Sequence, residues 1–380
     1  MRPFADGAYP SARPVWRGAR IAPSFGIVTN RQLTVLACIS VVVATGLGAA
    51  TPSAAADRHT VHPGESIQEA VDAARPGDSI FVLAGTYYES VHITKSLTLR
   101  GSGPKTVITP PASPTRAENP CAQAGNGICV IGAPDRTVDR VNIRTLTVKG
   151  FRKSGIWASR TDRMTVEQVT AEKNGTWGIA QERSTRGVFR FNRARDNAES
   201  GIFLANTIDR EGGATDTRHA LVRHNTLTGN RIGVTVRRVR NLAVSDNVLT
   251  GNCGGIFVVG DEGVPGAGAM TIRGNRIHTN NKFCKGNSRL PDIQGAGIVL
   301  TGAEETVVRD NSVRGNVGAS PLSGGILLFK SFVGARNTDN VIKDNEVQGN
   351  QPADLANQGT GSGNTFTGNR CVTSQPAGMC

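Results

Sequence analysis

The sequence predicts an all-β chain, folded as a single right-handed parallel β-helix with three strands per coil. Three observations predict it: a glycine phrase with a basic period of 22–23 residues, an asparagine phrase in register with it, and short runs of alternating apolar residues between them. A helix is excluded because the apolar spacing is two and Gly and Asn recur every few residues. Aromatic residues make up only 5% of the chain and glycine 46 of 380 residues, which suits short strands and tight turns.

The first 56 residues have the pattern of an export signal. Five arginines precede an apolar run at 33–50, and three alanines follow at 54–56. This order predicts a signal peptide that is removed after export. The leader lacks an Arg-Arg pair, which favours the Sec route over the twin-arginine route. We therefore expect a secreted protein, and no later segment has the length of a membrane span.

Residues 57–100 predict a capping helix followed by the first coils. Ser66 and Glu69 form a capping box, apolar residues line one helical face after it, and Pro76-Gly77-Asp78 ends the helix. A helix at this place would keep the open sheet end from pairing with other chains. The strands expected next are Ser79–Val82, Ser90–Ile93 and Ser96–Leu99.

Residues 101–370 carry the repeats. Each glycine phrase is Gly followed by Ile or Val. One coil cannot bury its own apolar face, so we expect the coils to stack on one another. The phrases begin at Gly155, Gly178, Gly201, Gly233, Gly255, Gly297 and Gly325. The spacings are 23, 23, 32, 22, 42 and 28 residues, so some turns carry insertions.

The asparagine phrase, Asn-x-Φ-x-x-Asn, marks turns. Asn tolerates the left-handed backbone of a sharp turn, and its amide can bond to the Asn of the next coil. We therefore interpret these residues as structural ladders. The pairs are Asn192 and Asn197, Asn225 and Asn230, Asn247 and Asn252, Asn275 and Asn280, Asn311 and Asn316, Asn345 and Asn350, and Asn364 and Asn369.

Six cysteines follow the leader, an even number that suggests disulfides in an exported chain. Neighbours in sequence favour three pairs, although six cysteines allow fifteen connectivities. The pairs are Cys121 with Cys129, Cys253 with Cys284, and Cys371 with Cys380. The last pair defines a tail, 371–380, which we expect to close the far end of the helix.

The opening segments at 66–82 (SIQEAVDAARPGDSIFV), 85–93 (GTYYESVHI) and 96–101 (SLTLRG) resemble the start of pectin-lyase-like superfamily proteins. The later coils resemble the short repeats of its NosD-type subgroup, and the resemblance covers about residues 58–370. It implies a β-helix, but lyases, hydrolases, esterases, epimerases, tailspikes and adhesins share that fold. The hydrolase motif is matched only by Asn337-Thr338-Asp339, without the Asp-Asp pair and Gly-His-Gly that accompany it. Neither a metal site nor a cofactor is expected, since the His and Met clusters of a copper site are lacking.

The residue after each inward Ile or Val should point outward and form an apolar stripe. Its members are Trp157, Ala180, Phe203, Thr235, Phe257, Val299 and Leu327. In one interpretation Trp157, Phe203 and Phe257 bind substrate by stacking on sugar rings, together with Lys330 from a nearby loop. In the other, loops fold over the stripe and make a satellite core. The insertions fall only in the two turns beside this sheet, so we expect loops that wall a groove there.

Catalytic candidates lie in the next outward row and the loops. Glu182 with Arg237 would supply a base and a cation for a lyase or epimerase. Glu182 with Asp209 or Asp261 would supply the two carboxylates of a glycosidase. No motif fixes either set, and solvated loop charges are the simpler interpretation.

A second column is basic: Arg190, Arg223, Arg273, Arg309 and Lys343, interrupted by Ser245. This column could bind an acidic polymer. Alternatively, the aliphatic parts of these side chains could cover a strand face while their charged groups pair with Asp246, Asp310 or Asp344. Five Arg and one Asp belong to the leader, which leaves 38 basic against 29 acidic residues in the rest. This balance is compatible with an acidic partner, or with ordinary solubility.

The expectation is thus a secreted, monomeric, carbohydrate-active β-helix that acts on an extracellular and acidic polysaccharide as a lyase, epimerase or hydrolase. It needs no cofactor and binds no nucleic acid. Two alternatives stay open: a non-catalytic polysaccharide-binding or adhesive β-helix, and an enzyme that uses an apolar groove for a non-carbohydrate substrate.

Overall fold

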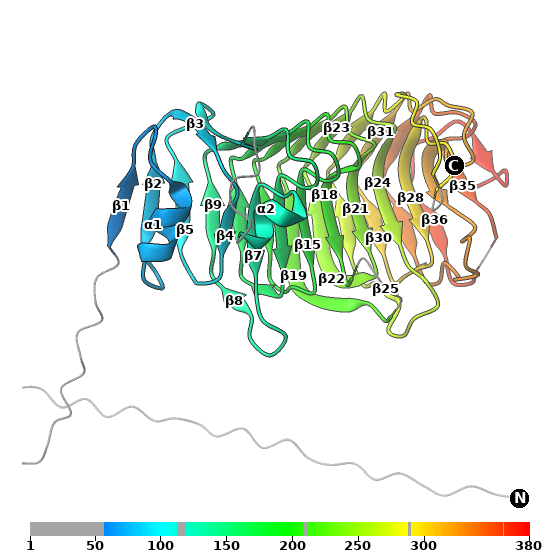
Figure 1. Cartoon of the computed structure of the whole chain (residues 1–380). Coiled ribbons are helices and arrows are strands. Elements are labelled where there is room, and N and C mark those ends of the chain that lie inside the picture. Colours follow the sequence, from blue (N-terminus) through cyan, green and yellow to red (C-terminus); the bar gives the residue numbers. More distant parts are fainter. Residues whose placement is uncertain (1–56, 112–118, 208–211, 288–289, 360) are drawn as a thin grey trace, which may run out of the picture. The chain divides into compact units, whose positions relative to one another are not determined.

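The computed structural model describes residues 57–111, 119–207, 212–287, 290–359 and 361–380. Strands of three parallel sheets follow one another in a fixed order, sheet A, sheet B, sheet C, and each cycle forms one coil (Figure 1). The stacked coils form a right-handed parallel β-helix, as the repeats predict. The expected signal peptide, residues 1–56, lies outside the described residues.

Sheet A includes the strands that precede the first asparagine of each phrase. Its main path is β1 (Arg58–Val61), β2 (Ser79–Val82), β5 (Thr98–Gly101), β9 (Asn142–Arg144), β13 (Thr165–Glu167), β16 (Val188–Arg190), β19 (Thr215–Arg223), β22 (Val239–Ser245), β26 (Thr271–Arg273), β30 (Val307–Arg309), β33 (Val341–Lys343) and β36 (Thr365–Thr367). Two short strands lie off this path: β25 (Ala267–Gly268) and β29 (Ala303–Glu304).

Sheet B includes the strands between the two asparagines. Its strands are β3 (Gly85–Tyr88), β6 (Thr106–Thr109), β10 (Thr147–Lys149), β14 (Thr170–Glu172), β17 (Arg193–Arg195), β20 (Thr226–Thr228), β23 (Val248–Thr250), β27 (Arg276–His278), β31 (Ser312–Arg314) and β34 (Glu346–Gln348).

Sheet C includes the glycine-phrase strands. Its strands are β4 (Val91–Ile93), β7 (Ile128–Ile131), β11 (Ile156–Ser159), β15 (Ile179–Glu182), β18 (Ser200–Ala205), β21 (Ile232–Arg237), β24 (Gly254–Val259), β28 (Ala296–Thr301), β32 (Gly324–Leu328), β35 (Leu355–Asn357) and β37 (Ser374–Gln375). A two-stranded sheet of β8 (Val138–Asp139) and β12 (Thr161–Asp162) lies between sheets C and A in the chain.

The glycine of each phrase is needed because the coils approach closely there. At Gly178, an added Cβ would lie 2.7 Å from the carbonyl oxygen of Gly201 in the next coil. The Ile or Val that follows is fully buried in every coil from Ile156 to Ile326. These residues fill the axial core together with inward residues of sheets A and B.

The helix α1 (Ile67–Ala73) covers the first coil. The Glu69 N–H donates to Ser66 Oγ at 3.2 Å, as the capping box predicts. A feature that sequence did not reveal adds to this cap: the Glu89 carboxylate accepts from the Ile67 and Gln68 N–H groups at 2.7 and 3.0 Å. A second helix, α2 (Pro120–Ala124), was also not predicted. Among the described residues, no helix is long and apolar enough to cross a membrane.

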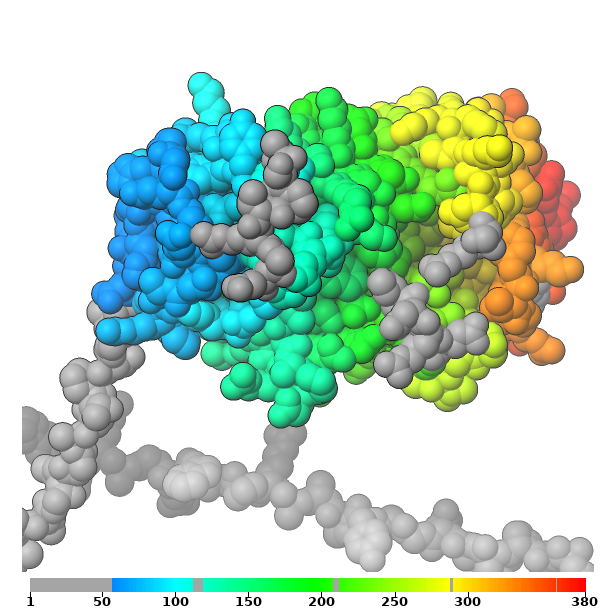
Figure 2. All heavy atoms as spheres, viewed as in Figure 1, coloured from blue at the N-terminus to red at the C-terminus, as the bar shows by residue number. Residues whose placement is uncertain are grey.

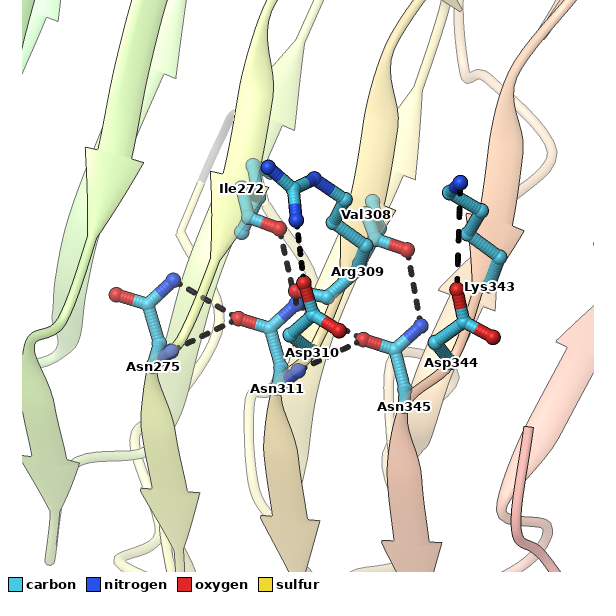
Figure 3. Close-up of polar contacts among 9 residues, drawn as sticks. All are labelled: Ile272, Asn275, Val308, Arg309, Asp310, Asn311, Lys343, Asp344 and Asn345. Atoms are coloured by element: carbon cyan, nitrogen blue, oxygen red, sulfur yellow. Dashed lines mark hydrogen bonds and ion pairs between the residues drawn. The ribbon is translucent and has the colours of Figure 1, made fainter. Parts of the chain in front are cut away.

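The two asparagine columns form continuous ladders, as expected, but the last predicted pair was placed wrongly. Asn369 accepts from Asn345 and so belongs to the first column, whereas Asn364 accepts from Asn340 in the turn before sheet A. Figure 3 shows three rungs: Asn275 donates through Nδ2 to Asn311 Oδ1, and Asn311 donates to Asn345 Oδ1, both at 2.9 Å. The same amides also bond to backbone carbonyls, for example Asn311 Nδ2 to Ile272 O at 2.9 Å. Every hydrogen-bonding atom of these buried amides is therefore used within the turns, which supports a structural role.

The three predicted disulfides are present: Cys121–Cys129, Cys253–Cys284 and Cys371–Cys380. In the tail, Cys371 and Met379 pack against the axial core. The tail therefore covers apolar side chains at the C-terminal end of the coils, as α1 does at the other end.

Candidate functional site

The predicted outward stripe exists on sheet C. The strands pair in register, so that Trp157, Ala180 and Phe203 are successive partners, and Phe257, Val299 and Leu327 are successive partners further along. A second outward row, two residues later, places Ser159, Glu182, Ala205 and Arg237 side by side in that order. Figure 2 shows the face of the molecule on which these strands lie.

The C-terminal part of the stripe is a satellite core, which is the second of the two interpretations that the sequence left open. Phe257 is only 2% exposed. It belongs to an apolar cluster with Ile293 and Leu322, two residues of the turns between sheets B and C. The Cys253–Cys284 disulfide belongs to the same cluster. The inserted turns thus pack onto the stripe and fill the space in which the sequence suggested an apolar groove.

The N-terminal part of the stripe carries three stacked aromatic rings. Trp157 and Trp177 lie 5.7 Å apart at 18°, and Trp177 and Phe203 lie 4.4 Å apart at 8°. Both tryptophans are half-buried, and Phe203 is 5% exposed. Trp177 was not among the expected residues because it lies in the turn before β15, outside the strand periodicity. The two tryptophans are therefore the more accessible members of this stack.

Glu182 is a buried carboxylate in the row beside these rings. It is 6% exposed, and its Oε1 accepts a hydrogen bond from the Ser159 hydroxyl at 3.0 Å. Its Oε2 is also buried but has no hydrogen-bond partner. An unpaired buried carboxylate oxygen costs stability, and such groups recur at catalytic sites.

One arginine contacts this carboxylate, and two others lie in nearby coils. Arg183 Nε lies 3.7 Å from Glu182 Oε1, and its guanidinium also donates to Thr207 Oγ1 at 2.9 Å. Arg160 occupies the equivalent turn position one coil earlier, and both residues have left-handed backbone, with φ of 54° and 47°. Arg237 lies two coils further along the row, roughly 10 Å away at the usual strand spacing. The group therefore combines one carboxylate with several cations.

The turn beneath this group is held by an ion pair. Asp162 Oδ1 accepts hydrogen bonds from Arg186 Nε at 2.7 Å and from the Thr185 hydroxyl at 2.6 Å. The Arg186 guanidinium is the main reason that the pKa of Asp162 lies below its ordinary value. Because Asp162 follows β11 by only a few residues, this pair fixes the strand end that carries Ser159.

The other expected site residues do not join this group. Asp261 forms a buried ion pair with Arg238, so it is not a second carboxylate free for a glycosidase reaction. Its coil is three steps from that of Glu182, roughly 14 Å away. Asp209 lies outside the described residues. Lys330 is exposed five coils away, in a cleft of about 480 Å³ that Arg336 also lines.

Among the described residues, no group of three or more His, Cys, Asp or Glu side chains could hold a metal ion. The six cysteines after the leader are in disulfides.

Two family models match the sequence. One, described as a right handed beta helix region, matches residues 118–265. The other, described as periplasmic copper-binding protein (NosD), matches residues 206–378. A search of curated proteins gave no significant match.

Several solved structures are similar. The A-module of mannuronan C-5 epimerase AlgE6 from Azotobacter vinelandii has a TM-score of 0.55 and 18% identity, over 81% of this chain and 90% of that one. Dettilon tailspike protein has a TM-score of 0.53 and 13% identity, over 83% and 68%. Pectate lyase Pel9A has a TM-score of 0.50 and 13% identity, over 84% and 78%. At these identities the likeness shows the fold.

Proposed function

The chain has the right-handed parallel β-helix fold of the pectin-lyase-like superfamily, and from this premise we propose that it is a secreted enzyme acting on an acidic polysaccharide. The reaction begins with removal of the hydrogen beside a uronate carboxylate. The observation that carries the proposal is the buried Glu182, with one unpartnered oxygen, among arginines on sheet C. The disulfides support an oxidising compartment outside the cytoplasm.

Glu182 is the base in this scheme. The Ser159 hydroxyl holds its Oε1, so Oε2 is the atom that accepts the proton. Arg183 binds the uronate carboxylate and neutralises the charge that develops on it as the proton leaves. In binding the substrate it gives up its contacts with Glu182 and Thr207, which uncovers the base.

The carbanion then has two outcomes. Expulsion of the glycosidic oxygen on the neighbouring carbon, which takes a proton from water, gives an unsaturated uronate, the product of a lyase. Delivery of a proton from water to the opposite face gives the epimer, and in both cases Glu182 returns its proton to water. Trp157 lies two residues before Ser159, the strand partner of Glu182, and the half-buried stacked tryptophans support a bound sugar ring.

A hydrolase is less well supported by the same residues. Glycoside hydrolysis needs a second carboxylate within roughly 5–10 Å of the first. Among the described carboxylates, the expected partner Asp261 is held by Arg238 on a distant coil.

The test uses the disulfide-bonded protein with alginate, polygalacturonate and dextran. Absorbance of unsaturated uronates detects a lyase, NMR of the polymer detects epimerisation, and reducing ends without new absorbance detect hydrolysis. Glu182→Gln keeps the size of the side chain and removes the base, so activity should fall by at least about a hundred-fold. The matched control is Glu172→Gln, a buried glutamate that pairs with Arg195 on sheet B.

Activity on either uronate polymer that Glu182→Gln abolishes and Glu172→Gln preserves would support the proposal. Hydrolysis, activity on dextran, or a fully active Glu182→Gln variant would contradict it. Binding of the polymers without any product would favour a non-catalytic β-helix.

A further inference from the structure

A basic row runs along the outward face of sheet A. Strand pairing aligns its residues in successive coils, as the sequence suggested. The row is Arg100, Arg144, Glu167, Arg190, Arg223, Ser245, Arg273, Arg309 and Lys343. Neighbours are separated by roughly 4.8 Å, the spacing between strands. From β13 to β33, each turn from sheet A to sheet B is two residues long, so these turns carry no insertion.

The C-terminal end of the row is neutralised by its own turns. Figure 3 shows Arg309 directed toward Asp310 and Lys343 toward Asp344, each acid being the next residue in the chain. At Arg223 and Arg273 the next residues are His224 and Gly274. In the described part of the chain, neither arginine has an ion-pair partner.

The middle of the row is therefore the more cationic sector. Its acidic members are Glu167, which pairs with Arg190 at 2.7 Å, and Asp246, which follows Ser245 in the turn. The same sector carries four basic residues: Arg144, Arg190, Arg223 and Arg273. A regular row of cations on a flat face suits a chain of regularly spaced anions.

An exposed aromatic ring stands at the edge of this sector. Phe191 is 49% exposed, and it stacks on His224 with ring centroids 5.1 Å apart at 8°. The Arg190 guanidinium lies 6.0 Å from the Phe191 ring centre. Phe191 has a φ of 56°, a left-handed backbone that is strained for a bulky residue.

Burial of the Phe191 ring does not offset this backbone strain, because half of the side chain is exposed. Equivalent turn positions in other coils hold Gln168, Asp246, Asp310 and Asp344, also at positive φ. These short or polar residues suit the turn better than an exposed ring does. The turn requires the left-handed backbone but not a bulky ring, and an exposed aromatic ring at a strained position often marks a binding site.

We propose that Arg190, Phe191, Arg223, His224 and Arg273 form a second, non-catalytic binding surface for an acidic polysaccharide. The rings contact the face of a sugar, and the arginines bind carboxylates on successive residues of the polymer. This surface lies on sheet A, whereas Glu182 lies on sheet C, so it holds a polymer without taking part in proton transfer. It does not depend on the proposed reaction.

The test measures binding of alginate by calorimetry in the disulfide-bonded Glu182→Gln background, in which the proposed reaction does not consume the polymer. Arg223→Ala with Arg273→Ala removes two charges from the surface, and the affinity should fall on the order of ten-fold. Arg193→Ala with Arg276→Ala removes two charges from the outward row of sheet B and is the matched control, expected to change affinity less than about two-fold. Phe191→Asn removes the ring and suits the left-handed turn, so it should weaken binding and raise thermal stability slightly.

Equal losses in the two double variants would overturn the proposal, since net charge alone would then explain binding. Unchanged binding in Phe191→Asn would also overturn it. Dextran bound as tightly as alginate, or single-stranded DNA bound more tightly with the same sensitivity to Arg223 and Arg273, would contradict an acidic polysaccharide as the partner. Failure of the reaction at Glu182 leaves all these measurements interpretable, because none of them follows turnover.

Discussion

Replacement of Asn275 by alanine tests the energetic role of the asparagine ladders. Asn275 is fully buried, and its Oδ1 accepts from the backbone and side-chain N–H groups of Asn247 at 3.0 and 2.9 Å. Its Nδ2 donates to Val244 O at 3.0 Å and to Asn311 Oδ1 at 2.9 Å. Four hydrogen bonds are lost at about 1 kcal/mol each, and their buried partners cannot reach water. We expect the free energy of unfolding to fall by about 3–5 kcal/mol.

Equilibrium unfolding in urea, followed by circular dichroism with the disulfides intact, measures this loss. The matched control is Asn142→Ala on the outward face of sheet A, because Asn142 is half-buried and makes one long hydrogen bond to Thr98 at 3.4 Å. The control should lose less than about 0.5 kcal/mol. A loss below about 1 kcal/mol for Asn275→Ala, or equal losses for the two variants, would refute the ladder argument.

Three further predictions follow from single contacts. Because Arg186 lowers the pKa of Asp162, the pair stabilises the fold above the unfolded-state pKa of that carboxyl, and this contribution is lost as the pH falls through the folded-state pKa; Asp162→Asn should lower the melting temperature at pH 7, and this effect should shrink as the pH falls through the folded-state pKa. Replacing both Cys253 and Cys284 by alanine opens a 31-residue separation and should cost about 3–4 kcal/mol, with increased binding of a hydrophobic dye; unchanged dye binding would contradict the satellite core. If uronate oligomers bind beside the stacked tryptophans, they should alter the tryptophan fluorescence of the protein, and dextran oligomers should not.

The strand order and register could be predicted because they follow from a period. Inward residues such as Ile202, the glycine turns and the asparagine ladders recur with each coil, and stacking is the one arrangement that buries them all. The strands β1 and β3 were missed, whereas β2 and β4 in the same part of the chain were expected from their alternating apolar residues. The cap contributed by Glu89 was missed because it joins residues more than twenty positions apart.

The candidate site was predicted only in part. Glu182, Arg183 and Arg237 could be found because they lie in or directly after the strand period, whereas Trp177 lies in a turn that the period does not reach. The burial of Phe257 could not be predicted, since it depends on how two inserted turns fold back onto the strands.

The central claim is that Glu182 removes the hydrogen beside a uronate carboxylate, and proton NMR of alginate oligomers in D₂O tests it most directly. Elimination and epimerisation both remove the signal of that hydrogen, so one measurement covers both reactions. The account predicts that the protein and its Glu172→Gln variant erase the signal and that Glu182→Gln does not. Loss of the signal at the same rate with Glu182→Gln, or cleavage of the oligomers with the signal retained, would contradict it.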